Sequence, residues 1–287
     1  MVVAILGLLI FSYITLAARR NPLLLSNPAN GNDGSLFHSH HTRLNNASVP
    51  FLVLVTEDVP QKHCDLLRKD GATVIPVQSL EPDAIKPVWR RWKDLLPRLY
   101  LWRITGYDKI LYLDADSVLL HPIDEVFSQP AATIRKPRAA GLDDPNDHPL
   151  PEHYMIAGTH DPWVEQYLPP VPGRETYELD NFMNAGFFVM QRSQNIFDYY
   201  VSRLENSKRC DPVYPEQNLL NCVHRTDGPM PWQDLGSGWN QKKPNRSDYE
   251  KGLKSVHHRW WRPLSDKSLQ EQVQDVMKEM EHHIRKG

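Results

Sequence analysis

The chain has 287 residues, which is long enough for one sizeable domain and an appendage. Its 33 Lys and Arg residues nearly balance its 35 Asp and Glu residues, and no basic block stands out, which argues against a nucleic-acid partner. Its 24 Pro residues exceed the usual share of about 5%, so we expect many irregular connections and no helical bundle.

The N-terminal segment is dominated by an apolar run from Val2 to Ala18, which two arginines close. A helix over this run would span roughly 25 Å, enough for the hydrocarbon core of a bilayer. We therefore expect residues 1–20 to form a single-pass membrane anchor. A cleaved signal peptide, which the small residues of "TLAA" favour, and a wrongly assigned gene start are the alternatives. Residues 21–49, rich in Asn, Ser, His, Gly and Pro, are expected to be a stem.

An alternating pattern of strand and helix begins after the stem. Phe51–Val55 predicts a strong β-strand, and Thr73–Val77 predicts a second one. Between them, Cys64, Leu66 and Leu67 are expected to make one face of a helix. This βαβ pattern is typical of a parallel strand pair.

A second predicted helix, Leu95–Ile104, leads to the apolar strand Ile110–Leu113, which ends at Asp114 and Asp116. Residues i and i+2 of an extended chain point to the same side, so the two carboxylates can face one point. Like charges that close disfavour each other unless a cation lies between them. Aspartates after a strand also form turns and helix N-caps, so the pair alone is a weak signal.

The next strong strand, Phe187–Met190, is entered through Asn184, Ala185 and Gly186. The small residues let another backbone segment or a ligand approach closely. Ligands of open α/β sheets bind at the carboxyl ends of the strands, and Asp114 and Asp116 are expected at such an end.

Three further segments complete the chain. A helix is predicted from Pro215, with acidic and amide side chains in its first turn. The segment "KSVHHRWWRP" predicts a short strand that ends in two histidines. The tail from Ser265 predicts an amphipathic packing or interface helix whose apolar face carries Leu269, Val273, Val276 and Met280.

The three cysteines have no spacing typical of a metal site. Cys210 and Cys222 could pair in an oxidising lumen, which would leave Cys64 over. Buried free thiols are the alternative.

Taken together, the ordered motifs resemble those of glycosyltransferase family 8, the glycogenin-like retaining transferases. These motifs are the acidic pair, the Asn-Ala-Gly strand, the Glu-Gln helix start and the late Val-His. The resemblance covers about Pro50 to Pro263 and is closest to fungal Golgi members related to N-acetylglucosaminyltransferases. It implies an α/β fold of the GT-A type, a Rossmann-like nucleotide-diphospho-sugar transferase with a mixed central sheet, over residues 50–264. Residues 265–287 would then be a helical tail.

The resemblance implies a metal-dependent retaining transferase. Such an enzyme moves a sugar from a UDP-sugar, of the UDP-GlcNAc or UDP-glucose class, to a glycan or glycoprotein acceptor, with Mn²⁺ or Mg²⁺ neutralising the departing diphosphate. Asp114, Asp116 and His257 would be the metal ligands, with His258 as the neighbouring alternative. The implied location is the Golgi membrane with the catalytic domain in the lumen, and a homodimer is a further expectation.

The resemblance also implies catalytic residues. Glu216 and Gln217 stand where the family has Asp-Gln near the anomeric carbon. Gln217 would orient the acceptor or the sugar, and Glu216 would stabilise developing positive charge. Asp180 would touch the sugar, although a loop aspartate with no role is the alternative.

Substrate-binding residues follow from the same resemblance. Asn184, Ala185 and Gly186 match the sugar-binding strand, with the Asn184 side chain on donor hydroxyls. Arg98 stands where the family has a Lys. In the segment that matches the family's late Lys, Arg262, or Arg259 as the alternative, would reach the diphosphate.

The start of the domain departs from the family pattern. Residues 21–46 offer no equivalent of the first strand, which contacts the uracil base in family members, so the sheet is expected to lack it. A catalytically weak or inactive member that acts as a binding or scaffold protein is therefore one alternative. A glycogenin-like self-glucosylating primer is another.

Overall fold

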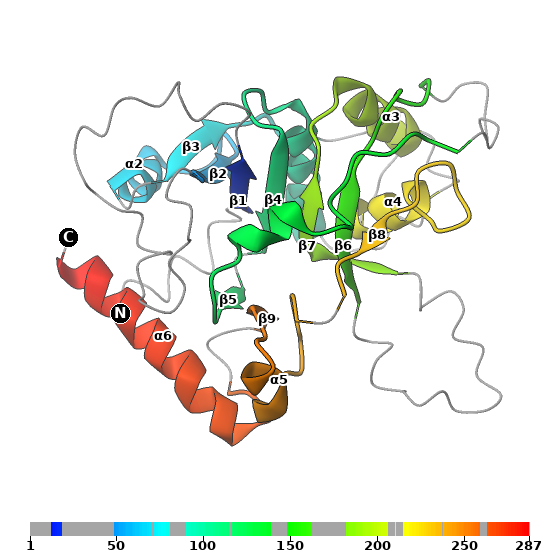
Figure 1. Ribbon diagram of the computed structural model, residues 1–287. Helices are drawn as coiled ribbons and strands as arrows, with labels where there is room; N and C mark the ends of the chain where they lie inside the picture. Colours follow the sequence, from blue (N-terminus) through cyan, green and yellow to red (C-terminus); the bar gives the residue numbers. More distant parts are fainter. Residues whose placement is uncertain are drawn as a thin grey trace.

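A mixed seven-stranded sheet lies at the centre of the molecule (Figure 1). In spatial order its strands are β3 (Thr73–Pro76), β2 (Phe51–Val55), β1 (Tyr13–Ala18), β4 (Lys109–Leu113), β7 (Met183–Met190), β6 (Ile156–His160) and β8 (Gln233–Asp234).

The structure is a computed structural model, and it describes much of the chain from Tyr13 onward. The described residues are 13–18, 49–69, 72–80, 90–114, 116–138, 148–161, 182–205, 210, 215–236, 238–258 and 263–286.

The strand directions confirm the predicted α/β class with a mixed sheet. β2 and β3 run parallel, and α2 (Gln61–Lys69) connects them, as the βαβ pattern predicts. β8 runs parallel to β6, whereas β4 and β7, and β7 and β6, are antiparallel pairs. β6 itself was not predicted, because its sequence IAGTH contains Ala and Gly, which are not strong strand formers.

Strand β1 corrects two predictions made from the N-terminal sequence. It lies between β2 and β4 and pairs antiparallel with both, so the sheet does not lack a strand ahead of β2. Its six residues were expected in a membrane-spanning helix, and they form a strand instead. Among the residues that the structure describes, no helix combines the length and the apolar character needed to cross a bilayer.

The two faces of the sheet are buried by different helices. On β2, Leu52 and Leu54 pack on one face and Val53 on the other, as the two-residue alternation of a strand requires. The first face is covered by the 3-10 helix η3 (Arg90–Arg103), α3 (Gln194–Glu205) and α4 (Pro215–Val223), and the second by α2 and the 3-10 helix η4 (Asp124–Ser128).

Helix η3 differs from the α-helix predicted over Leu95–Ile104. It is wound as a 3-10 helix and contains Pro97. Proline has no backbone N–H to donate to the carbonyl four residues earlier, which disfavours regular α-helical winding at this point.

A second, small sheet pairs β5 (Ser117–Leu119) with β9 (Ser255–His257). It packs with α5 (Arg246–Glu250) and α6 (Lys267–Lys286), and we call these four elements the β5–β9 unit (Figure 1). The predicted C-terminal helix is confirmed as α6. Its apolar face, of which Leu269, Val273 and Val276 are buried, packs in a core cluster separate from the two that flank the main sheet.

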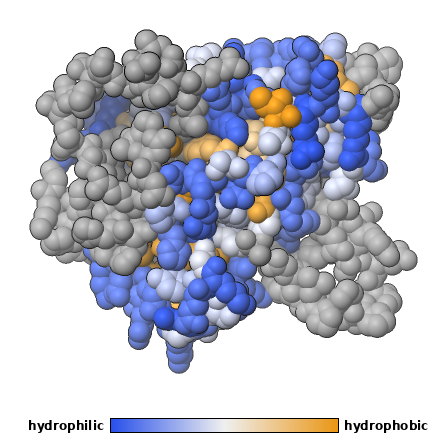
Figure 2. Space-filling view, viewed as in Figure 1, coloured by the Kyte–Doolittle hydropathy of each residue, from blue (hydrophilic) through white to orange (hydrophobic). Residues whose placement is uncertain are grey.

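Of the two alternatives left open for Cys210 and Cys222, the structure has the disulfide. The two residues form a disulfide with their Cα atoms 5.7 Å apart, and Cys64 is a buried free thiol. Over the described part of the face in Figure 2, hydrophilic residues dominate and apolar residues show in a few small areas.

Candidate metal centre and adjoining polar site

The acidic pair lies where β4 leaves the main sheet. Leu113 is the last residue of β4, and the backbone N–H of Asp114 donates to the carbonyl of Gly186 on β7 at 2.9 Å. The N–H of Ser117 then donates to the carbonyl of Asp114 at 3.0 Å, which turns the chain into β5. The carboxylate of Asp114 is therefore fixed to the main sheet, and that of Asp116 lies at the start of the β5–β9 unit.

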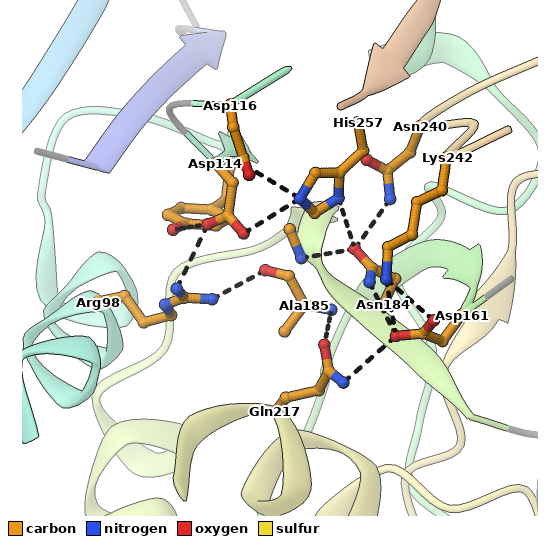
Figure 3. Close-up of polar contacts among 12 residues, drawn as sticks. Arg98, Asp114, Asp116, Asp161, Asn184, Ala185, Gln217, Asn240, Lys242 and His257 are labelled. Carbon is orange, nitrogen blue, oxygen red and sulfur yellow. Dashed lines mark hydrogen bonds and ion pairs between the residues drawn. The ribbon is translucent and has the colours of Figure 1, made fainter. Parts of the chain in front are cut away.

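His257 reaches the acidic pair because of the register between β5 and β9, in which it is paired with Ser117. Its Nε2 lies 3.1 Å from Oδ1 of Asp116 and 3.7 Å from Oδ2 of Asp114 (Figure 3). Within the described parts of the chain, this is the one group of three such side chains close enough to share a metal ion, with ligand atoms within 4.8 Å of one another. The structure thus brings together the three predicted metal ligands.

The donor set fits a divalent cation. Two carboxylate oxygens and one imidazole nitrogen converge, and the two negative charges would repel each other without a cation between them. Carboxylate oxygens suit Mg²⁺ and Mn²⁺, and an imidazole nitrogen is a common ligand of divalent metal ions. The side chains of Asp114 and Asp116 are 28% and 30% exposed, which leaves an ion a path from solvent.

Gly186, on β7, lies directly against the side chains of His257 and Asp114. A Cβ at this position would lie 2.3 Å from Cε1 of His257 and 2.8 Å from Oδ2 of Asp114. Such distances are far inside van der Waals contact, so only glycine allows both ligands to pack onto β7. The sequence predicted that another segment or a ligand lies very close to the Asn-Ala-Gly tripeptide. The groups that lie close to it are the side chains of His257 and Asp114.

Arg98 joins the metal centre to the start of α4. Its guanidinium donates to the carbonyl of Ala185 at 2.9 Å and to Oδ1 of Asp114 at 3.3 Å, and it lies 3.5 Å from Oε1 of Glu216. It also lies over the ring of Tyr112, 4.7 Å from the centroid. The side chain is 3% exposed, so in the structure Arg98 holds protein carboxylates in place, and a direct phosphate contact remains a prediction.

Glu216 is a buried carboxylate beside this arginine. Burial raises its pKa, and the positive charge of Arg98 opposes that shift. Its Oε2 has no hydrogen-bond partner among the described residues. A buried carboxylate oxygen without a partner is costly, which suggests that a further group approaches this position.

Gln217 lies between β7 and a second buried acid. Its Oε1 accepts from the N–H of Ala185 at 3.0 Å, and its Nε2 donates to Oδ2 of Asp161 at 3.4 Å. Ala185 on β7 therefore lies next to the first turn of α4, which carries the other two predicted residues, Glu216 and Gln217.

Asn184 lies within the site, but its amide is bonded to protein groups. The side chain is 2% exposed, its oxygen accepts from the N–H of Gly186 at 2.9 Å, and its nitrogen donates to Asp161 at 2.9 Å. The contact with donor hydroxyls expected of Asn184 remains a prediction.

Sequence reasoning missed Asp161, Asn240 and Lys242. Asp161 is buried at the carboxyl end of β6, and its two oxygens lie 3.0 and 3.2 Å from Nζ of Lys242. Its position directly after a strand was the signal, and it was overlooked because β6 was not predicted. Asn240 and Lys242 lie in an irregular segment whose sequence gives no such signal.

Two predicted site residues, Asp180 and Arg262, lie outside the described residues, so their roles stay predictions. The neighbouring alternative ligand His258 is placed differently from His257. Its backbone N–H donates to the carbonyl of Asp116 at 3.0 Å, and its side chain is not part of the metal cluster.

Comparison with known proteins shows distant relatives. No family model matches the sequence. Galactinol synthase 7 of Arabidopsis thaliana is 29% identical over 263 residues, which cover 78% of this chain and 74% of that protein. An uncharacterized protein of Schizosaccharomyces pombe is 23% identical over 247 residues, which cover 74% of this chain, and the chain spans 63% of the length of that protein.

One solved structure shows a weaker likeness. The apo-form glycosyltransferase GlyE of Streptococcus pneumoniae matches with a TM-score of 0.42 and 14% sequence identity, over 81% of this chain and 55% of that chain. No assignment rests on it. The likeness to galactinol synthases supports a glycosyltransferase similar to those of family 8, and it has no bearing on N-acetylglucosaminyl specificity. The mixed sheet with the acidic pair at the end of β4 agrees with a GT-A-like fold.

Proposed function

We propose that this protein is a metal-dependent retaining glycosyltransferase that moves a sugar from a UDP-sugar to a glycan or glycoprotein acceptor. The observation that carries the proposal is the convergence of Asp114, Asp116 and His257 at the end of β4. The likeness to galactinol synthases supports the transfer of a sugar as the reaction class. A UDP-sugar of the glucose or N-acetylglucosamine class is the donor we propose.

Mn²⁺ is the metal we propose, because the donor set combines two carboxylates with an imidazole. Asp114, Asp116 and His257 would hold the ion. When bound, it would supply the positive charge that neutralises the diphosphate leaving group.

The residues next to the metal ligands would bind and orient the sugar. Gln217 is fixed by the N–H of Ala185 and by Asp161, so its amide is held in one orientation beside the metal centre. Glu216 offers a buried carboxyl group whose pKa is raised by burial, and the positive charge of the nearby Arg98 opposes this shift. A carboxylate in this place would stabilise positive charge that develops on the sugar ring as the bond to phosphate breaks.

We further propose that the protein works in the lumen of the secretory pathway, in the Golgi. The disulfide between Cys210 and Cys222 supports this location, because such bonds persist in oxidising compartments. The alternative of a weak or inactive member was based on a missing first strand. β1 lies between β2 and β4 and runs antiparallel to both, and that alternative stays a prediction that an activity assay decides.

A donor screen with the full chain tests the proposal. UDP-glucose, UDP-galactose and UDP-N-acetylglucosamine would each be incubated with the protein, with Mn²⁺ or with chelator, and release of UDP would be measured. We expect hydrolysis or transfer of at least one donor that requires metal and is lost in Asp114→Asn. Equal rates with chelator would contradict metal dependence, and no release from any donor with any metal would contradict transferase activity.

A further inference from the structure

A chain of buried amide side chains lies behind His257, on the side away from the acidic pair (Figure 3). Nδ1 of His257 lies 3.2 Å from Oδ1 of Asn184. The same oxygen accepts from Nδ2 of Asn240 at 2.9 Å. Asn240, in the irregular segment before α5, is therefore connected to His257 through the side-chain amide of Asn184.

The partners of Asn184 determine which atom of its amide faces the histidine. The backbone N–H of Gly186 can only donate, so the atom it contacts must be the side-chain oxygen of Asn184. The amide nitrogen is held at the other end by the carboxylate of Asp161, 2.9 Å away, which Lys242 neutralises. The amide therefore cannot rotate by half a turn without breaking contacts at both ends.

This fixed oxygen favours one tautomer of His257 in a metal-bound centre. When Nε2 gives its lone pair to a metal ion, the hydrogen of the neutral ring is on Nδ1, which lies 3.2 Å from the acceptor oxygen of Asn184 and can donate to it. Nε2 is the nitrogen that lies 3.1 Å from Asp116 and 3.7 Å from Asp114. Nε2 therefore points toward the place where the carboxylates of Asp114 and Asp116 converge.

Asn240 adopts this position at a local cost. Its φ angle is +55°, a left-handed conformation that asparagine adopts more readily than most residues other than glycine, and the residue is 2% exposed. Its side-chain oxygen is buried without a hydrogen-bond partner among the described residues. Its nitrogen is used twice, toward Asn184 and toward Oγ1 of Thr159 at 3.2 Å. An unfavourable local conformation or an unpaired buried atom is kept only where the surrounding structure enforces it, and such residues cluster at functional sites.

We propose that Asn240 is a positioning residue for the metal centre. By donating to Asn184 it holds the amide oxygen that fixes the tautomer and the ring plane of His257. Outer partners of metal-binding histidines typically change metal affinity by about 10- to 100-fold when they are removed. This inference rests on the proposed metal site and extends it to a residue about which the sequence motifs say nothing.

Binding of Mn²⁺ to the full chain, followed by electron paramagnetic resonance without any nucleotide sugar, tests the proposal. Asn240→Gly removes the donor, and glycine tolerates the left-handed backbone. We expect its Mn²⁺ dissociation constant to rise roughly 10- to 100-fold. Thr159→Val is the matched control, because it removes the other partner of the same amide nitrogen and leaves the contact with Asn184 intact. We expect this control to stay within about threefold of the wild type.

The outcomes separate the two proposals. If the wild type binds no Mn²⁺, the proposed metal centre is wrong. If the wild type binds it and Asn240→Gly binds equally well, the positioning role is wrong and the metal centre stands.

A second measurement needs no folded variant of Asn240. Nitrogen NMR of the histidine-labelled wild type with bound Zn²⁺ identifies the coordinating ring nitrogen, and His257→Gln assigns the signal. Coordination through Nε2 with a protonated Nδ1 is the expected result, and coordination through Nδ1 would overturn the proposal.

Discussion

At the scale of single residues, Gly186 gives the sharpest prediction about the metal centre. In Gly186→Ala the new Cβ would overlap His257 and Asp114, so one ligand must move away. We expect the variant to lose Mn²⁺ binding by at least about 100-fold, measured by electron paramagnetic resonance. Gly158→Ala on β6 is the control. Its Cβ would crowd the side chain of Met183 and lie 3.2 Å from the carbonyl oxygen of Phe187, but it would touch none of the proposed metal ligands, so Mn²⁺ affinity should be retained. Normal Mn²⁺ binding by Gly186→Ala would contradict the geometry of the centre.

A variant of Glu216 can separate the binding of Mn²⁺ and UDP from the rate of sugar transfer. Glu216→Gln keeps the shape of the side chain and removes its negative charge. Because Glu216 is not a proposed metal ligand, we expect Mn²⁺ and UDP affinities to change little while the transfer rate falls by roughly 100-fold. Calorimetry and a rate assay under saturating donor measure the two quantities. A variant with an unchanged rate would remove Glu216 from the proposed catalytic residues.

The buried side chain of His224 should make the free energy of unfolding depend on pH. Burial lowers its pKa from 6.5 to about 4, and its ring bonds Tyr200 and the carbonyl of Met230. Between these two pKa values the unfolded chain binds a proton that the folded chain does not. The free energy of unfolding should therefore fall, by up to about 3 kcal/mol, as the pH drops from 7 to 4.

Urea denaturation at several pH values measures this loss. His224→Gln cannot gain the proton, so its free energy of unfolding should fall less over the same range than that of the wild type. Parallel pH profiles for the two proteins would show that His224 does not cause the loss.

At the scale of elements, strand β1 is the feature that departs most from the sequence prediction. Thr15 is paired with Leu52 on β2 and with Tyr112 on β4. A proline there cannot donate a backbone hydrogen bond in the middle of a central strand. We expect Thr15→Pro to lower the free energy of unfolding by roughly 3 kcal/mol, the order of the cost of proline at an interior helical position. Thr15→Val, which suits a strand, should be close to the wild type.

Urea denaturation of the full chain compares the two Thr15 variants. Equal stability of the proline and valine variants would mean that this segment does not pair with β2 and β4 in solution. The membrane-anchor interpretation of the N-terminal sequence would then regain support.

The elements that could be predicted are those whose pattern has one interpretation. β2, α2, α4 and α6 have clear apolar periodicity or start signals, and they were found within a few residues of their bounds. β1 could not be predicted, because a fully apolar run has no alternation and suits a membrane helix as well as a central strand. β6 has a weak propensity of its own and depends on pairing with β7.

At the scale of the whole molecule, the metal centre joins two separately packed parts. Asp114 is fixed to the main sheet, whereas Asp116 and His257 flank the β5–β9 unit with its own apolar core. A bound ion would therefore hold the two parts together. The convergence of these three side chains could be predicted, because their motifs occur in the order of the family that the sequence resembles.

The polar groups behind the metal centre could not be predicted in the same way. Lys242 meets Asp161 across 81 positions of sequence, and Asn240 meets Asn184 across 56. Contacts of such separation exist only once the sheet has formed, and no local pattern marks either partner. Deriving them requires the folded structure.

Calorimetric titration of UDP into the full chain, with and without Mn²⁺ and beside Asp116→Asn, tests the central claim most directly. We predict binding that requires both Mn²⁺ and the Asp116 carboxylate, because the ion would bridge the protein and the diphosphate. UDP binding of equal strength without the metal, or in the variant, would contradict a metal-dependent nucleotide-sugar site, as would the absence of any binding.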